Sequence, residues 1–198
     1  MVTIGILGSR GKSAVAEIIE KELIKVGKGV YIIGTKEDSV KEFMKLFTDQ
    51  IDYVIIEISR EDILGKHLDK IKFDILIITT LKKENEELLQ SIQSLIKSIK
   101  ENGYIIFDSD SIQQINFTCD KVYPITYGLN GKTTVTASSI QEVDGLYFSY
   151  CLQRGIYTLT NSIVQSFEKP VKVIGNYDDV YYYLAAFTCL LVIGELRI

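Results

Sequence analysis

The sequence predicts an α/β fold in which a mainly parallel sheet has helices on both faces and is joined to a small antiparallel β portion. Three observations predict this fold. In the first half, short apolar runs alternate with amphipathic segments. Those runs are almost continuously apolar, as strands are when both faces of a parallel sheet are covered. From residue 122 to about 173, short β-prone runs are instead separated by turn residues, a pattern typical of antiparallel strands.

Five strands and three helices are expected in the first half. The strands are the apolar runs, and the helices have apolar residues spaced three or four apart. The expected strands are Val2–Leu7, Val30–Ile33, Tyr53–Ile56, Ile75–Ile78 and Tyr104–Phe107. The expected helices run from Lys12 to Val26, from Val40 to Phe47 and from Leu88 to Ile99, the last of them closing at Asn102-Gly103. Right-handed crossovers should connect the parallel strands.

The 198 residues are expected to form one domain, because about 100–200 residues per domain is usual. Its expected parts are an α/β core at 1–120, a β-rich part at 121–175 and a C-terminal helix within 176–198, running from Asp179 to Ile193. The apolar stretch of that helix is shorter than the roughly 20 residues that span a bilayer, so the helix should be buried in the protein. The N-terminus lacks the basic region and cleavage site of a signal peptide. We therefore expect a cytoplasmic protein with no membrane partner.

Composition and charge argue against two kinds of function. The net charge of -4, with acidic and basic residues mixed along the chain, disfavours a nucleic-acid partner, which usually requires a basic face. The three cysteines are widely spaced with no CxxC pair, and there is a single histidine, His67, so the sequence lacks the ligand spacing of a structural zinc site. The cysteines are expected to be reduced thiols in the core.

A glycine-rich loop, Gly8-Ser9-Arg10-Gly11-Lys12-Ser13, lies between the first expected strand and the first expected helix. Glycines let backbone N–H groups turn toward an anion, and the helix adds its positive N-terminal end. Lys12 is the candidate catalytic residue because its ammonium can reach the β- and γ-phosphates, and the Ser13 hydroxyl can ligate Mg²⁺. The sequence therefore predicts a P-loop-type sheet that binds a nucleotide, ATP with Mg²⁺. The loop departs from the general pattern at Ile6, where that pattern has glycine, and a glycine-rich turn with no ligand is the alternative.

A second glycine-rich segment has nearly the same sequence motif as the first loop: Gly128-Leu129-Asn130-Gly131-Lys132-Thr133-Thr134. The residues that follow it, Val135 to Ile140, are typical of a strand rather than a helix. Without a helix N-terminus the anion site would be incomplete, so we expect an ordinary hairpin here.

Other polar residues have a functional and a structural interpretation. Glu57 ends the third strand beside the loop, where P-loop enzymes hold the metal, although an exposed strand-end glutamate is the alternative. Asp108 and Asp110 could contact a metal or a ribose, but we expect a turn with side chain–backbone hydrogen bonds. Tyr182 could stack on a base or pack in the core at a helix start. His67 is interpreted as a surface residue, with a ligand contact as the alternative.

Taken together, these segments resemble the central, ATP-binding domain of the Mur ligases, a family that includes folylpolyglutamate and poly-γ-glutamate synthases. The loop Gly8–Ser13 resembles the family's G-T-N-G-K-T, and its last four residues resemble the R-G-K-S of poly-γ-glutamate synthases. Further matches follow in order at Gly34-Thr35, Glu57-Ile58-Ser59, Phe73 to Thr79, Asp108-Ser109-Asp110, Ile125 to Gly128 and Asp179 to Ala186. The resemblance implies phosphates held by Gly8, Ser9, Arg10, Gly11, Lys12 and Ser13, and Mg²⁺ held by Ser13 and Glu57. It also places Asp179 and Tyr182 at the positions of two asparagines near the adenine.

The departures from the family pattern fall where the family holds its acceptor substrate. Arg60 replaces a second serine, His67 replaces an arginine, and no histidine follows Thr79-Thr80. The segment of the carbamylated lysine is shortened, and the family's N-terminal and C-terminal domains have no counterpart in this sequence. One hypothesis is therefore a subunit of an ATP-dependent amide-forming ligase, similar to a UDP-N-acetylmuramyl tripeptide synthetase, whose other domains come from a second protein chain. The alternative is a non-catalytic relic or regulatory interaction module of the same fold. A P-loop switch or kinase would leave the β-rich half without an explanation.

Overall fold

The computed structural model describes residues 1–34, 51–68, 70–81, 85–111 and 121–198, and its elements alternate strand and helix before a β-rich second half. The strands of these residues are β1 (Val2–Leu7), β2 (Val30–Ile33), β3 (Tyr53–Glu57), β4 (Phe73–Ile78), β5 (Ile99–Asp108), β6 (Tyr123–Tyr127), β7 (Val135–Glu142), β8 (Leu146–Leu152), β9 (Ile156–Tyr157), β10 (Ile163–Val164) and β11 (Phe167–Val173). The helices are α1 (Lys12–Lys25), α3 (Arg60–Leu64), α4 (Glu86–Ile96) and α5 (Val180–Ile193), with a 3₁₀ helix, η1 (Tyr177–Asp179), directly before α5.

One nine-stranded sheet runs through the described residues in the order β11-β8-β7-β6-β5-β4-β1-β3-β2. Strands β2, β3, β1, β4, β5 and β6 are parallel to one another, whereas β7, β8 and β11 pair antiparallel. The mainly parallel sheet with an antiparallel portion is thus confirmed. The antiparallel strands continue the same sheet, and only β9 and β10 pair separately.

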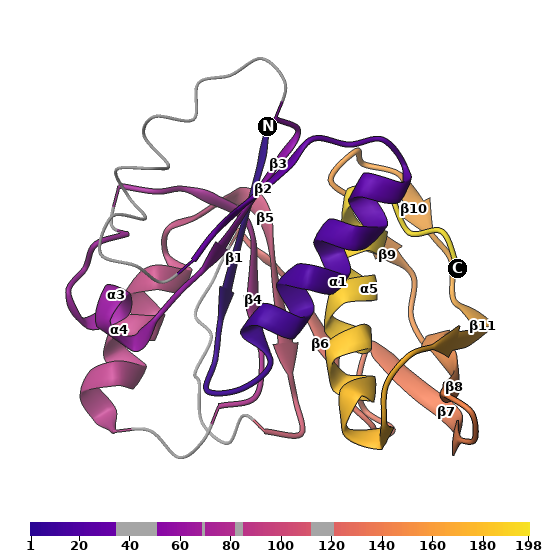
Figure 1. Ribbon diagram of the computed structural model, residues 1–198. Helices are drawn as coiled ribbons and strands as arrows, with labels where there is room; N and C mark the ends of the chain where they lie inside the picture. Colours follow the sequence, from indigo (N-terminus) through magenta and orange to yellow (C-terminus); the bar gives the residue numbers. More distant parts are fainter. Residues whose placement is uncertain (35–50, 69, 82–84, 112–120) are drawn as a thin grey trace.

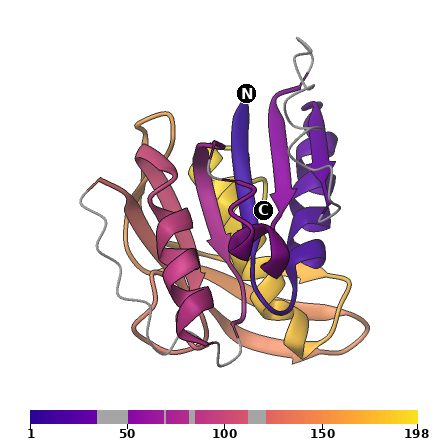
Figure 2. The same ribbon diagram turned by 90° about the vertical axis from the view of Figure 1, so that its left-hand side faces the viewer.

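Helices cover both faces of the parallel part of the sheet, as the nearly continuous apolar strands predict. Helices α1 and α5 lie side by side on one face, and α3 and α4 lie on the other (Figures 1 and 2). Alternate residues of each strand serve the two layers: Ile55 of β3 belongs to the cluster with α1 and α5, while Val54 and Ile56 belong to the cluster with α3 and α4. Burying each such side chain stabilises the fold by about 1.5–3 kcal/mol.

The C-terminal helix is confirmed and is buried along nearly its whole length. From Leu184 to Ile193 every residue of α5 is buried, against α1 on one side and the sheet on the other. It ends at Gly194, which adopts a left-handed conformation and closes the helix through bonds to Leu190 O and Leu191 O. No helix among the described residues is long and apolar enough to cross a membrane.

Two expected helices need comment. The helix expected from Val40 to Phe47 lies outside the described residues. The helix expected to reach Ile99 is wrong at its end, because α4 stops at Ile96. Both the amide and the hydroxyl of Ser98 donate to Leu95 O, which closes the helix, and Ile99 then pairs with β4 as the first residue of β5. The apolar spacing continued past the helix because Ile99 is buried in the same cluster from the sheet side.

Candidate functional site

The loop Gly8–Ser13 leaves the carboxyl end of β1 and leads directly into α1, between the carboxyl ends of β3 and β4. Gly11 is the N-cap of α1, with φ at 85°, and no side chain caps this helix. No acidic residue lies in its first turn, whereas Ser59 caps α3 and Asn85 caps α4. The first-turn amides of α1 therefore retain their donor capacity and the positive end of the helix dipole, which suits an external anion.

Glycine is required twice in this loop because neighbouring side chains touch its backbone. A Cβ at Gly8 would overlap the Thr79 hydroxyl, and a Cβ at Gly11 would overlap the ring of Tyr182. The Thr79 hydroxyl donates to Arg10 O at 2.6 Å. The end of β4 and the start of α5 thus hold the loop from two sides.

Lys12, Ser13 and Glu57 come together at the start of α1. The Lys12 ammonium donates to Gly8 O at 2.9 Å, so it lies folded back over the loop. The Ser13 hydroxyl donates to Glu57 Oε2 at 2.6 Å, and Glu57 is the last residue of β3. A hydroxyl and a carboxylate in contact supply the oxygen ligands that Mg²⁺ prefers. No group of three or more His, Cys, Asp or Glu residues suited to a metal occurs in the part of the chain that the structure describes.

A cavity of about 260 Å³ lies on the Arg10 side of the loop, and Tyr182 lines it as well as covering Gly11. Asp179, the other residue that the sequence places near the nucleoside, does not line this cavity. Its carboxylate accepts from Asn176 N at 2.9 Å and closes the capping box of η1. Asp178 lines the cavity instead. The resemblance selects Asp179 by its position in the family pattern, and that position does not report how the short 3₁₀ turn orients the two adjacent acids.

Asp108 and Asp110 also line this cavity, and the structure gives both of them internal partners. Asp108 is 2% exposed; it accepts from the Thr80 hydroxyl at 3.2 Å and from Asp110 N at 2.9 Å. Burial raises the pKa of the Asp108 carboxyl above its usual 3.8. The expected turn with side chain–backbone bonds is therefore confirmed, since Asp108 accepts from the amide two residues ahead.

Asp110 holds the second glycine-rich loop. It accepts from Leu129 N at 2.7 Å and from the Tyr181 hydroxyl at 2.9 Å, and it also accepts from the Asn130 side chain. Gly128 is needed here because a Cβ would lie 2.8 Å from the Asp110 carboxylate. This loop thus contains an internal anion and leads into β7, as expected from the strand-like residues after it. The predicted hairpin is wrong, because β6 and β7 meet in parallel at Tyr127 and Val135.

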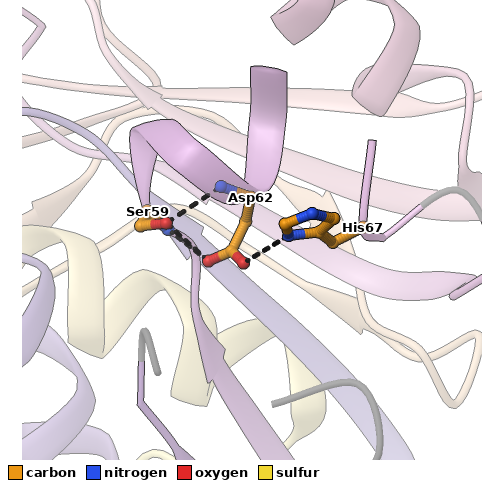
Figure 3. Close-up of polar contacts among 3 residues, drawn as sticks. All are labelled: Ser59, Asp62 and His67. Carbon is orange, nitrogen blue, oxygen red and sulfur yellow. Dashed lines mark hydrogen bonds and ion pairs between the residues drawn. The ribbon is translucent and has the colours of Figure 1, made fainter. Parts of the chain in front are cut away.

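A second cavity, of about 400 Å³, lies on the Lys12 side of the loop, between the sheet and the helices α3 and α4. Helix α3 is fixed there by a capping box: the Ser59 hydroxyl accepts from Asp62 N, and the Asp62 carboxylate accepts from Ser59 N (Figure 3). His67 Nδ1 lies 3.4 Å from the other carboxylate oxygen of Asp62. The ring packs back onto Gly65 and its side chain is 52% exposed, so His67 is a surface residue and does not line the cavity.

Known proteins share this fold. The chain is 21% identical over 224 aligned positions to the UDP-N-acetylmuramoyl-L-alanyl-D-glutamate–2,6-diaminopimelate ligase of Geobacillus thermodenitrificans, covering 96% of this chain and 44% of that ligase. The structure of MurF ligase from Thermotoga maritima in complex with ADP matches 98% of this chain and 47% of that one, with a TM-score of 0.73 at 14% identity. Mycobacterium tuberculosis folylpolyglutamate synthase complexed with ADP matches 100% of this chain and 55% of that one, with a TM-score of 0.63 at 8% identity.

The two structural likenesses show the fold, and the chain spans less than half the length of the ligase to which its sequence is similar. A match across most of the chain identifies the family. The family model described as the Mur ligase middle domain matches residues 6–190, and the chain therefore belongs to the Mur ligase family through its middle domain.

Proposed function

We propose that the chain binds ATP with Mg²⁺ at the loop Gly8–Ser13 and acts as the ATP-binding part of an amide-forming ligase. The observation that carries this proposal is the uncapped start of α1, where first-turn amides, the Lys12 ammonium and the Ser13–Glu57 pair converge. The ADP named with both solved relatives supports the same ligand class. An ATP ligand also fits the cytoplasmic location expected from the sequence.

Each residue of the loop has a distinct role in this proposal. The amides of the loop hold the phosphates, except that of Ser9, which already donates to Thr80 O at 2.9 Å. Lys12, released from Gly8 O, places its ammonium on the γ-phosphate, where negative charge develops during phosphoryl transfer. Ser13 and Glu57 hold Mg²⁺, which supplies further charge neutralisation when bound. Tyr182 closes the opposite side of the loop, next to the cavity on the Arg10 side, where the nucleoside would lie.

The acceptor side requires groups from outside these residues. A single cationic loop stabilises charge on a phosphoryl group, but it does not orient an amine for attack. In the related ligase, more than half of the length lies outside the matched stretch. We propose that these regions come from outside residues 1–198, for example from a second chain. We also propose that residues 1–198 fold as one unit, since one hydrophobic cluster contains Ile4 of β1, Val15 of α1, Phe148 of β8 and Leu184 of α5.

Nucleotide binding is tested by thermal unfolding with and without Mg-ATP. Ligand at 100 times Kd stabilises a protein by about 2.7 kcal/mol. Lys12→Ala should remove most of the shift in melting temperature. Lys132→Ala is the matched control, because Lys132 follows a glycine and precedes a hydroxyl residue in the second loop, as Lys12 does in the first. This variant should retain the shift in melting temperature. Absence of any shift for the wild type at millimolar Mg-ATP contradicts the proposal.

Ligase activity is a separate measurement. If the chain is the ATP-binding part of a ligase, a second chain that supplies the remaining regions should make it consume ATP in the presence of a carboxylic acid and an amine. A nucleotide shift without ATP consumption under those conditions would instead identify the non-catalytic module of the same fold.

A further inference from the structure

A surface groove of about 530 Å³ lies between α1, α5 and β11. Glu17 and Lys25 mark the ends of its α1 wall, which is about 12 Å long at 1.5 Å per residue. The groove shares no lining residue with either cavity beside the phosphate loop. Many of its lining residues are exposed, including Pro170, Lys172 and Ile174. A small-molecule site buries most of its ligand, so a groove this open is better suited to another protein.

The floor of the groove offers apolar surface to such a partner. Ile18, Val173, Tyr183 and Ile198 line it as half-buried residues that pack on the core beneath. Ile174, directly after β11, is 88% exposed. Its backbone is held in place, because the Tyr183 hydroxyl donates to Ile174 O at 2.7 Å. A partner that covers Ile174 would remove apolar surface from water, which favours association.

The composition of β11 disfavours one common mode of docking. In the sheet of the described residues β11 is the outermost strand, and an open strand edge can pair with an extended segment of another chain. Pro170, in the middle of β11, has no amide to donate, and Lys169 and Lys172 lie on either side of it. Proline and lysine are residues that block such pairing at sheet edges. A partner would therefore bind through side chains packed into the groove, as an amphipathic helix does.

The charges around the groove favour an acidic partner. The lining residues carry more cations than carboxylates: Lys21, Lys25, Lys172 and Arg197 against Glu17 and Glu22. Lys25 is already paired with Glu22 at 2.6 Å. Within the described ranges Lys21 and Arg197 have no ion-pair partner, so both are available to carboxylates of another protein.

A second copy of the chain does not offer a matching helix from its described residues. Their long helices already bury their apolar residues against the sheet or one another, as α4 does with Leu88 and Ile92 and α5 does from Leu184 to Ile193. We propose that the groove docks an amphipathic helix of a different protein, with its apolar face on Ile174 and acidic residues toward Lys21. Docking there leaves the phosphate loop open, so it is independent of nucleotide binding.

The experiment selects peptides on the whole chain from a displayed library. Library members have about 15 residues, the length at which an isolated helix becomes marginally stable. One set carries leucines along a single helical face and the other set carries them around the whole helix, while the remaining positions vary among Glu, Lys and Gln. The enriched peptides should have one-sided leucines and more Glu than Lys. Enrichment of lysine-rich peptides, of peptides without a single apolar face, or of none overturns the proposal.

One enriched peptide, labelled for fluorescence anisotropy, then locates the site. Ile174→Glu and Lys21→Glu should each weaken its binding about tenfold or more. The matched controls are Ile163→Glu, at a 57% exposed position on β10, and Lys97→Glu, at the exposed end of α4 on the other face of the sheet. Both controls should leave the Kd unchanged. Equal binding to the wild type and Ile174→Glu overturns the assignment to this groove. All four positions are exposed, so melting temperatures without peptide should match that of the wild type.

Discussion

Gly11→Ala tests the geometry of the candidate phosphate loop through stability alone. Two costs are expected. Gly11 has φ at 85°, a left-handed conformation that costs a residue with a Cβ about 1–2 kcal/mol. The new methyl group would also overlap the Tyr182 ring, and overpacking of this kind costs about 1–3 kcal/mol. The sum is roughly 2–5 kcal/mol, or a fall in melting temperature of about 4–20 °C for a protein of this size.

Chemical unfolding of a double-mutant cycle separates the two costs. Tyr182→Ala removes the overlapping ring, so Gly11→Ala in that background should cost only the conformational part, about 1–2 kcal/mol. Gly27→Ala is the control for that part, because Gly27 has φ at 76° and its Cβ would meet no atom within 4 Å. A Gly11→Ala cost no larger than that of Gly27→Ala, or one unchanged by Tyr182→Ala, would refute the contact between the loop and α5.

Three further predictions concern the surrounding network. Asp110→Ala removes the acceptor of Leu129 N and the Tyr181 hydroxyl and should lower the free energy of unfolding by about 1–2 kcal/mol, measured by urea titration. An unchanged free energy would contradict the stabilisation of the second loop by Asp110. Because the folded-state pKa of Asp108 is raised, the native state holds this proton to higher pH than the unfolded state, so stability should fall as pH rises through the window above 3.8. Asp108→Asn should make that fall smaller in unfolding curves taken at pH 4 to 7, and an identical profile would contradict the assignment. Ser59→Ala removes the α3 cap and should cost about 0.5–2 kcal/mol by thermal unfolding, whereas a neutral result would show that the cap is dispensable.

The sequence predicts the parallel strands well because their apolar runs are set by burial on both faces, and each expected run lies within an observed strand. It fails at the end of α4, where Ile99 continues the apolar spacing from a strand that packs on the same cluster. Periodicity reports which layer a residue faces, and it does not report which element brings the residue there. Asp179 is selected by its position in the family pattern, and in the structure its neighbour Asp178 lines the cavity while Asp179 closes the capping box of η1.

The two glycine-rich loops show where local sequence stops determining chemistry. Both loops contain Gly-Lys followed by a hydroxyl residue. In the second loop an anion is already part of the chain, because Asp110 accepts from Leu129 N and the Asn130 side chain. In the first loop no acidic side chain caps the helix that follows, and the nearby carboxylate of Glu57 bonds to the Ser13 hydroxyl rather than to an amide. An internal carboxylate makes one loop a structural joint, while the uncapped amides of the other suit it to a phosphate from outside the chain. The residue that distinguishes the two loops is Asp110, which lies about 20 positions before the second loop. A motif confined to that loop does not contain it.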